Sequence, residues 1–333
     1  MKIIVDAMGG DNAPLEIIKG AMLALDEFDE IDEIIFTGDE DKINESVKEN
    51  GIKLKKSRIV NCTQEISMCD EPASALKEKP DSSMAVGFKL LSEGEGDAFV
   101  SAGNTGAITV GATLIIKRIK GIKRPAIASL IPGDKKPFLL LDCGANSDCR
   151  AEFLYQFGYM GSLYMKNIMK CENPTVALAN NGSEDTKGNA LVKEAFELMK
   201  GAPYNFIGSI EGRQIPFGDA DVVVADGFSG NLILKTYEGA AKVLMEALEN
   251  AFNKNILSKL SYLGVKSSLD DMKTQFDYRE YGGAVLLGIK KPVIKSHGSA
   301  DAKTFKNAIK QAVWFLQTDL IEKTEEEIKS MQS

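Results

Sequence analysis

The sequence predicts a three-layer α/β/α fold built around a mostly parallel β-sheet. Short runs of β-branched and other apolar residues recur along the chain, and each is followed by a Gly-rich loop and a stretch of helical periodicity. Alternating strands and helices are typical of a parallel sheet that is covered by helices on both faces. The length of 333 residues suits a single α/β domain over residues 1–333, and no low-complexity linker divides the chain.

The first unit of this pattern is a strand at residues 2–7, the loop GGDN at 9–12 and a helix from about Pro14 to Phe28. Asp11 or Asn12 can cap this helix, and Pro14 suits its first turn. Apolar residues recur there at helical spacing, namely Leu15, Ile18, Met22 and Leu25. The same pattern predicts further strands at 97–101, 138–143, 175–180 and 221–226.

Two stretches depart from the pattern. Residues 127–132 and 137–142 read as paired strands joined by a polar turn at 133–136. Residues 253–278 read as a small protruding pair of short helices that meet near Tyr262–Val265. Leu257, Leu260 and Leu263 place apolar side chains at this tip. Two interpretations stay open, which are packing against a neighbouring helix or dimer partner, and a tip that contacts a membrane or another protein.

Composition excludes several classes of protein. The net charge of −8 and the pI of about 5.1 argue against general nucleic-acid binding, which needs a surplus of Lys and Arg. No apolar run approaches the ~20 residues that span a bilayer, so we expect a cytoplasmic protein. Five cysteines without a CxxC pair and the lone His297 supply no recognisable metal-ligand set. The sequence therefore predicts neither a metal site nor a cofactor.

The Gly-rich loops predict an anion site. Loops after parallel strands emerge at one edge of a sheet, so we expect the five loops to converge there. Glycine lets backbone N–H groups approach a ligand, and a helix N-terminus favours negative charge. The chain contains no GxGxxG at its first crossover, no GxxxxGK[ST] and no GxSxG. These absences argue against a standard dinucleotide site, a nucleotide P-loop and a serine hydrolase.

Charged and titratable residues beside the loops are candidates for the chemistry. Asp11 and Asp226 are each either capping residues or ligand contacts. Lys187 follows the strand at 175–180 and is either a solvated lysine or a cation that meets phosphate. His297, in the segment KSHGSAD, is either structural or a neutral imidazole that hydrogen-bonds phosphate or an oxyanion.

The loops, taken in order, resemble the bacterial phosphate acyltransferase (fatty acyl phosphate synthase) family. The matching segments are VDAMGGD (5–11), SAGNTGA (101–107), LLLDCGAN (139–146), NGSEDTKGN (181–189), DVVVADGFSGN (221–231), YGGAVLLG (281–288) and KSHGSAD (295–301). The resemblance implies transfer of a fatty acyl group from acyl carrier protein to inorganic phosphate, giving acyl phosphate for phospholipid synthesis. It also implies a homodimer, a product that feeds a membrane glycerol-3-phosphate acyltransferase, and a fold similar to isopropylmalate dehydrogenases and phosphate acetyltransferases.

With phosphate as the nucleophile, the protein must hold an anion against a thioester and stabilise the oxyanion that forms. We expect loops 9–12, 103–106 and 227–231 to bind phosphate. The residues predicted to bind phosphate or substrate are Gly9, Gly10, Asp11, Gly103, Asn104, Thr105, Gly106, Asn146, Asp226, Gly227, Ser229 and Gly230. The residues predicted to be catalytic are Lys187, His297 and Asn231.

An acidic carrier protein needs a local basic surface on an acidic enzyme. The basic segment at residues 117–124 provides one without any acid, through Lys117, Arg118, Lys120, Lys123 and Arg124. It predicts carrier docking, with a solvated helix end as the alternative. Other functions stay open, namely a phosphate acetyl- or butyryltransferase that uses coenzyme A thioesters, and a non-catalytic organiser of lipid enzymes at the membrane. A decarboxylating dehydrogenase would need a dinucleotide site and a carboxylate metal cluster, which the sequence does not offer.

Overall fold

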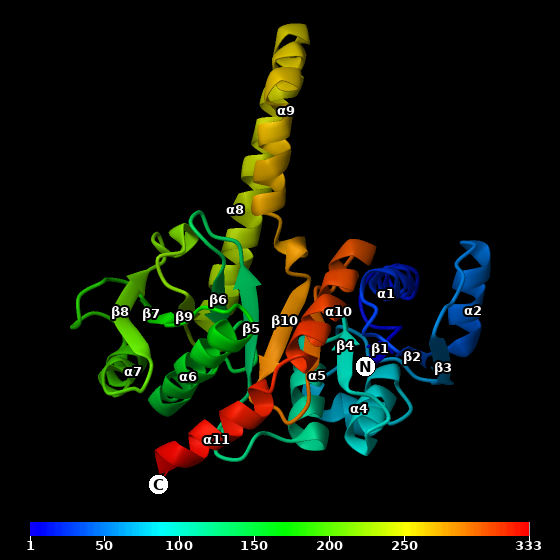
Figure 1. Cartoon of the computed structure of the whole chain (residues 1–333), viewed down its shortest axis with the longest axis horizontal. Coiled ribbons are helices and arrows are strands. Elements are labelled where there is room, and N and C mark those ends of the chain that lie inside the picture. The colour runs from blue at the N-terminus through cyan, green and yellow to red at the C-terminus, as the bar shows by residue number, and fades with distance from the viewer. Residues whose placement is uncertain (333) are drawn as a thin grey trace.

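The computed structural model describes residues 1–332, apart from the side chains of 256, 257, 259, 260, 263, 278 and 330–332. Its strands form one 11-stranded sheet in the order β3-β2-β1-β4-β11-β10-β5-β6-β9-β7-β8 (Figure 1). The strands are β1 (Lys2–Asp6), β2 (Glu33–Gly38), β3 (Ser57–Asn61), β4 (Ala98–Ser101), β5 (Ala126–Ile131), β6 (Phe138–Leu141), β7 (Thr175–Asn180), β8 (Asn205–Glu211), β9 (Val222–Val224), β10 (Gly283–Leu287) and β11 (Val293–Ser296). The predicted α/β class is confirmed.

Helices cover both faces of this sheet. They are α1 (Leu15–Glu27), α2 (Glu40–Glu49), α3 (Pro72–Glu78), α4 (Ser83–Glu93), α5 (Thr105–Gly111), α6 (Ala151–Asn167), α7 (Ala190–Lys200), α8 (Gly227–Asn253), α9 (Ile256–Gln275), α10 (Ala302–Leu316) and α11 (Leu320–Gln332). Side chains from α1, α6, α7, α10 and α11 share one apolar cluster with the sheet. Side chains from α3, α4, α5 and the first part of α8 share the cluster on the opposite face.

The strands form two parallel blocks that run in opposite directions. The first block is β3, β2, β1, β4 and β11, and the second is β6, β9, β7 and β8. Between them, β10 is antiparallel to β11 and to β5, and β5 is antiparallel to β6. The prediction that all five Gly-rich loops meet at one edge is therefore wrong. Loops after β1, β4 and β11 lie at the upper edge in Figure 1, and those after β6, β7 and β9 lie at the lower edge.

The predicted pair of strands at 127–132 and 137–142 is confirmed. β5 and β6 pair antiparallel, with Ile131 opposite Phe138 and Ala128 opposite Leu141. The predicted helix from Pro14 to Phe28 is also confirmed as α1, although its N-cap is Pro14 and no side chain caps it. Asn12 instead donates its side-chain amide to the carbonyls of Ser299 and Ala300, both at 3.2 Å, and so ties two loops together.

The protruding helical pair is longer than the sequence suggested. α8 has 27 residues and α9 has 20, and the chain reverses at residues 254–255 rather than near Tyr262–Val265. The pair stands out above the upper edge of the sheet (Figure 1). Leu257, Leu260 and Leu263 fall in α9, and their side chains lie outside the described part of the structure. Across the described residues, no helix has both the length and the hydrophobicity to cross a membrane.

Candidate active site

A cleft of about 360 Å³ lies over the central strands, on the sheet face that α8 covers. Alternate residues of β5, namely Ile127, Ser129 and Ile131, form its floor. One wall comes from the loops at the upper edge, with Asp11, Thr105 and His297, and the other from α8, with Asn231, Lys235 and Glu238. This volume falls within the ~300–1,000 Å³ typical of small-molecule sites. The cleft thus draws its walls from distant parts of the chain.

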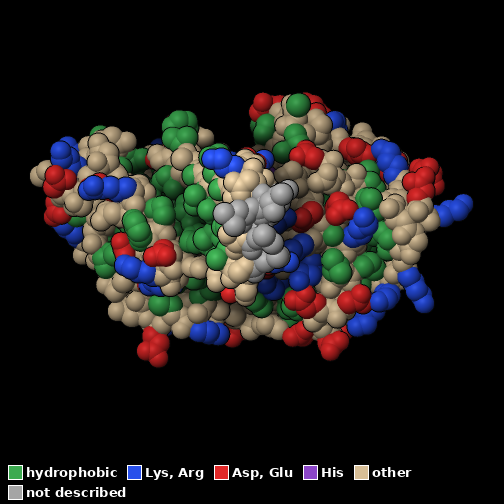
Figure 2. All heavy atoms as spheres, turned by 90° about the horizontal axis from the view of Figure 1, so that it is seen from above, with side chains coloured by type: hydrophobic (Ala, Val, Ile, Leu, Met, Phe, Trp, Pro, Cys, Tyr) green, Lys and Arg blue, Asp and Glu red, His purple; other side chains and the backbone are tan. Residues whose placement is uncertain are grey.

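The cleft is polar beside β11 and apolar over β5 and β6. His297 follows β11 at the upper edge, and the charged residues of α8 lie next to it. Ile127 and Cys143 lie toward the lower edge, because β5 begins there and β6 ends there. Leu234, Tyr237 and Ala284 add apolar surface to the lining. Figure 2 looks down on the upper edge and shows hydrophobic side chains and Lys or Arg side chains on opposite sides of the centre of the molecule.

Three loops pack tightly to form the upper wall. The Asp11 N–H donates to the Gly298 carbonyl at 2.8 Å, which joins the loop after β1 to the loop after β11. A Cβ at Gly9 would lie 2.7 Å from the Gly103 backbone nitrogen, so only glycine allows this approach. Gly10 has φ +101°, and a Cβ there would lie 2.8 Å from the Gly298 oxygen. Gly9, Gly10 and Gly103 therefore hold the wall together behind the lining residues.

His297 is oriented by neighbours on both sides of its ring. Its Nε2 lies 3.2 Å from Nζ of Lys235, and its Nδ1 lies 2.9 Å from the Ser299 hydroxyl oxygen. A lysine ammonium only donates, and the Ser299 N–H donates to Nδ1 at 3.3 Å, so donors lie beside both ring nitrogens. Burial, followed by the positive charge of Lys235, holds the pKa of His297 below its usual value. The predicted neutral imidazole agrees with this direction.

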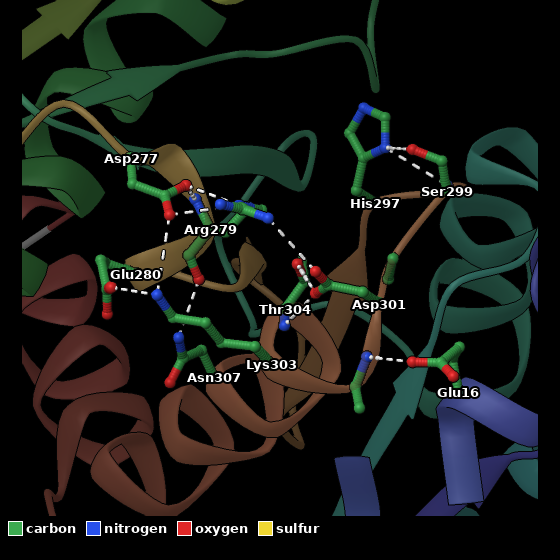
Figure 3. A network of polar contacts seen from close by, with 12 residues as sticks. Glu16, Asp277, Arg279, Glu280, His297, Ser299, Asp301, Lys303, Thr304 and Asn307 are labelled. Carbon is green, nitrogen blue, oxygen red and sulfur yellow. Dashed lines mark hydrogen bonds and ion pairs between the residues drawn. The ribbon is translucent and has the colours of Figure 1, made fainter. Parts of the chain in front are cut away.

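Figure 3 shows how the His297 loop is anchored. Asp301 caps α10 by accepting from the Thr304 N–H at 2.8 Å, and it also pairs with Arg279 at 3.3 Å. Glu16 of α1 accepts from the Ala302 N–H at 2.9 Å. His297 itself points away from this network, toward Ser299. The anchored side of the loop thus leaves the imidazole directed toward the cleft that it lines.

Lys235, Glu238 and Lys295 complete the polar end, and sequence motifs did not single them out. The Lys235 ammonium is 2.8 Å from Glu238 Oε2, and His297 Nε2 is 3.9 Å from the same oxygen. Lys295 enters from β11, and its ammonium donates to the carbonyls of Ala102, at 3.3 Å, and of Ser296. A lysine in a buried strand between Ile294 and Ser296, at the start of the matching segment KSHGSAD, is a signal that could have flagged Lys295.

Of the predicted site residues, Asp11, Thr105, Asn231 and His297 line the cleft. Others hold the surrounding backbone. The Asn104 side chain accepts from the Ala107 N–H at 3.0 Å and donates to the Met68 carbonyl at 3.2 Å. A Cβ at Gly106 would lie 2.5 Å from the Pro72 side chain, so Gly106 lets α5 approach α3.

The predicted residues at the start of α8 form a second set near the lower edge. Asp226 caps α8, accepting from the Ser229 N–H at 2.9 Å and the Ser229 hydroxyl at 2.8 Å. Asn146 donates its amide to the Pro125 carbonyl at 2.7 Å, and its own carbonyl accepts from the Gly227 N–H at 2.7 Å. Gly227 and Gly230 are buried against this loop. These residues position α8, which then carries Asn231 and Lys235 into the cleft.

Lys187 and the basic segment lie away from the polar cluster. Lys187 is exposed in the loop after β7, at the lower edge, and does not line the cleft. The basic segment precedes β5, also at the lower edge. None of its charged side chains forms an ion pair with another described residue. All five are exposed, namely Lys117, Arg118, Lys120, Lys123 and Arg124. No group of three or more potential metal ligands occurs among the described residues.

A family model described as fatty acid synthesis protein matches residues 1–323. The phosphate acyltransferase of Thermoanaerobacterium thermosaccharolyticum is 46% identical over 329 residues, which cover 99% of this chain and 97% of that protein. The chain belongs to this phosphate acyltransferase family. Members of the family are transferases, and the chain is accordingly an acyltransferase enzyme.

Two solved structures share the fold of this family member. A phosphotransacetylase from Streptococcus pyogenes has a TM-score of 0.62 at 20% identity, covering 96% of this chain and 94% of that one. A 4-hydroxythreonine-4-phosphate dehydrogenase from Klebsiella pneumoniae has a TM-score of 0.53 at 12% identity, covering 95% and 98%. The likeness to phosphotransacetylase and dehydrogenase folds that the sequence predicted is therefore confirmed.

Proposed function

We propose that this chain transfers a fatty acyl group from the thioester of acyl carrier protein to inorganic phosphate, forming acyl phosphate for phospholipid synthesis. The observation that carries the proposal is the composition of the cleft. A cluster of one histidine, two lysines and a carboxylate adjoins an apolar floor within a single cavity. Such a cavity suits a reaction between an anion and the carbonyl carbon of a long aliphatic chain.

The reaction forms one C–O bond and breaks one C–S bond. A phosphate oxygen of HPO₄²⁻ attacks the thioester carbonyl, the thiolate leaves, and the phosphate proton ends on the sulfur. His297, neutral and with Nε2 facing the cleft, can relay this proton. The Lys235 ammonium next to it can donate to the oxyanion. Thr105 and Asn231 lie on opposite walls and can orient the phosphate between them.

Lys187 stays a second candidate for stabilising the oxyanion or the thiolate. Its exposed position outside the cleft lining favours His297 in this role. Replacing each by alanine separates the two candidates. We expect His297→Ala to lower kcat by at least about tenfold. A loss of that size in Lys187→Ala, with normal turnover in His297→Ala, would transfer the role to Lys187 and its loop.

The donor docks on the basic segment in this proposal. Five exposed cations without acidic neighbours provide the charge reversal that an acidic carrier needs on an acidic enzyme. The segment precedes Ile127, which lies in the floor of the cleft. A carrier bound at this edge could therefore extend its acyl thioester along the apolar floor toward His297.

A homodimer and peripheral membrane contact also belong to the proposal. The described part of α8 carries exposed apolar side chains along its length, namely Phe228, Leu232, Val243 and Leu244. Such a stripe on a helix is typical of an interface, and a second copy of the chain is the partner that we propose for it. A cytoplasmic enzyme with the helical pair directed at the membrane could pass acyl phosphate to a membrane glycerol-3-phosphate acyltransferase.

The test is to incubate the protein with acyl carrier thioester and phosphate and to detect acyl phosphate by phosphorus NMR. Coenzyme A thioesters of short and long acyl chains serve as parallel donors. We expect acyl phosphate with the carrier thioester at a higher kcat/KM than with any coenzyme A thioester. A higher kcat/KM with acetyl- or butyryl-coenzyme A would instead identify the protein as a phosphate acetyl- or butyryltransferase. Absence of product with every donor would indicate a non-catalytic organiser.

A further inference from the structure

Lys295 is a cation on the floor side of the cleft that has no carboxylate partner. Its Nζ donates to two carbonyls, those of Ala102 and Ser296, and a lysine ammonium has three donors. No carboxylate lies within 4.0 Å of this nitrogen among the described side chains. One N–H thus lacks a protein acceptor there, at a residue that lines the cleft.

A second cation, Lys235, lines the same cleft as Lys295. Lys235 projects from α8, and its charge is the largest electrostatic influence on Lys295, ahead of the attraction from Asp11 and Asp6. Burial and this repulsion together lower the pKa of Lys295 to about 8. Among the described side chains, Lys235 forms an ion pair with Glu238 alone. Two ammonium groups that repel each other across a cavity are stabilised when an anion occupies the space between them.

We propose that Lys295 and Lys235 bind the phosphate acceptor from two sides, as the paired cations of an anion site in the cleft. The inference rests on the proposed function and names the residues that select its acceptor. A phosphate held there contacts the two ammonium groups and lies beside His297, whose Nε2 is 3.2 Å from Lys235. Charge-assisted hydrogen bonds to phosphate are stronger than those between neutral groups, and they hold the nucleophile against the apolar floor.

The experiment compares Lys295→Met and Lys235→Met with Lys242→Met. Lys242 is an exposed lysine on the same helix, and it forms no ion pair with a described residue. Phosphate is titrated into each protein by calorimetry without acyl donor, and KM is measured for phosphate and for the donor separately. We expect the Lys295→Met and Lys235→Met substitutions to weaken phosphate binding by about ten- to hundredfold. The KM for the acyl donor should stay within about twofold of the wild-type value. Lys242→Met should match the wild type.

A pH profile distinguishes ligand binding from a structural role. In the wild type, KM for phosphate should rise as pH increases through about 8, because Lys295 loses its charge there. Lys295→Arg keeps a cation at all these pH values, so this alkaline limb should disappear. The second ionisation of phosphate is the same in both proteins and cancels in the comparison. If Lys295→Met fails to fold, Lys295→Arg still tests the inference through its pH profile, since it retains the charge.

The outcomes separate this inference from the proposed function. If the wild type makes acyl phosphate while Lys295→Met and Lys235→Met keep a normal KM for phosphate, the paired-cation site is wrong and the function stands. If the wild type neither binds nor uses phosphate, the proposed function fails first. An equal loss in Lys242→Met would overturn the inference, because it would reveal a general effect of surface charge.

Discussion

Gly230 was predicted to bind phosphate, but its surroundings predict a packing role that can be measured. A Cβ at this position would lie 2.0 Å from the Asp142 carbonyl oxygen, whereas ordinary contacts begin at 3.4 Å. The oxygen is fixed, because the Asp142 carboxylate accepts N–H groups from Ile127 at 3.0 Å and from Asn146 at 2.7 Å. Neither the first turn of α8 nor this loop can move away without breaking such bonds.

Gly230→Ala should therefore destabilise the protein. Overpacking costs about 1–3 kcal/mol and sometimes more, and the gain of about 1 kcal/mol from helix propensity offsets only part of it. With no room to repack, we expect a net loss of about 2 kcal/mol in the free energy of unfolding.

The assay is urea unfolding followed by circular dichroism at fixed protein concentration. Gly264→Ala in α9 is the matched control, because a Cβ there meets no described atom within 4 Å. This control should gain about 0.5–1 kcal/mol from helix propensity alone. A Gly230→Ala protein with an unchanged or higher urea midpoint would refute the packing argument and restore a ligand-binding reason for the glycine.

Three further predictions concern the cleft and the docking surface. Lys235→Met should shift the acid limb of the pH profile of kcat/KM toward pH 6.5, because removing this cation lets the pKa of His297 rise toward its usual value. An unchanged acid limb would show that the titration of His297 does not cause it. Arg118→Glu combined with Arg124→Glu should raise KM for the acyl carrier, with a smaller effect at high salt, and an unchanged KM would count against this surface. Ala284→Leu narrows the cleft, so it should lower kcat/KM for long-chain donors more than for short-chain donors in a chain-length series.

The sequence predicted the strands with continuous apolar runs and the β5–β6 pair, because local pattern determines both. It did not predict that β10 and β11 enter the middle of the sheet, or that the antiparallel β5–β6 pair makes the second block run opposite to the first. Strand order and direction depend on contacts between residues far apart in sequence, such as Lys295 opposite Ser101 and Ala284 opposite Ser129. For that reason the loops were assigned to one edge when they occupy two.

The difference between local pattern and long-range contacts also explains which residues of the candidate site the sequence predicted. Asp11, Thr105 and His297 stand in Gly-rich segments whose composition signals a loop near a ligand, and they line the cleft. Lys235 and Glu238 look in sequence like an ordinary surface pair on a helix, since they are three residues apart. Only the path of α8 across the sheet places them beside His297. The turn of the helical pair was predicted near Tyr262–Val265, whereas α9 continues through this stretch.

The position of β10 and β11 has a consequence for how the protein is made. These strands are the last in the sequence, yet they alone join β4 of the first block to β5, which pairs with β6 of the second block. A ribosome must therefore synthesise nearly 300 residues before the two halves of the sheet can be hydrogen-bonded to each other. Until then, β4 and β5 each present an open edge with unpaired backbone groups. Aggregation competes with folding at this stage, so we expect chaperone dependence to be greatest just before β11 emerges.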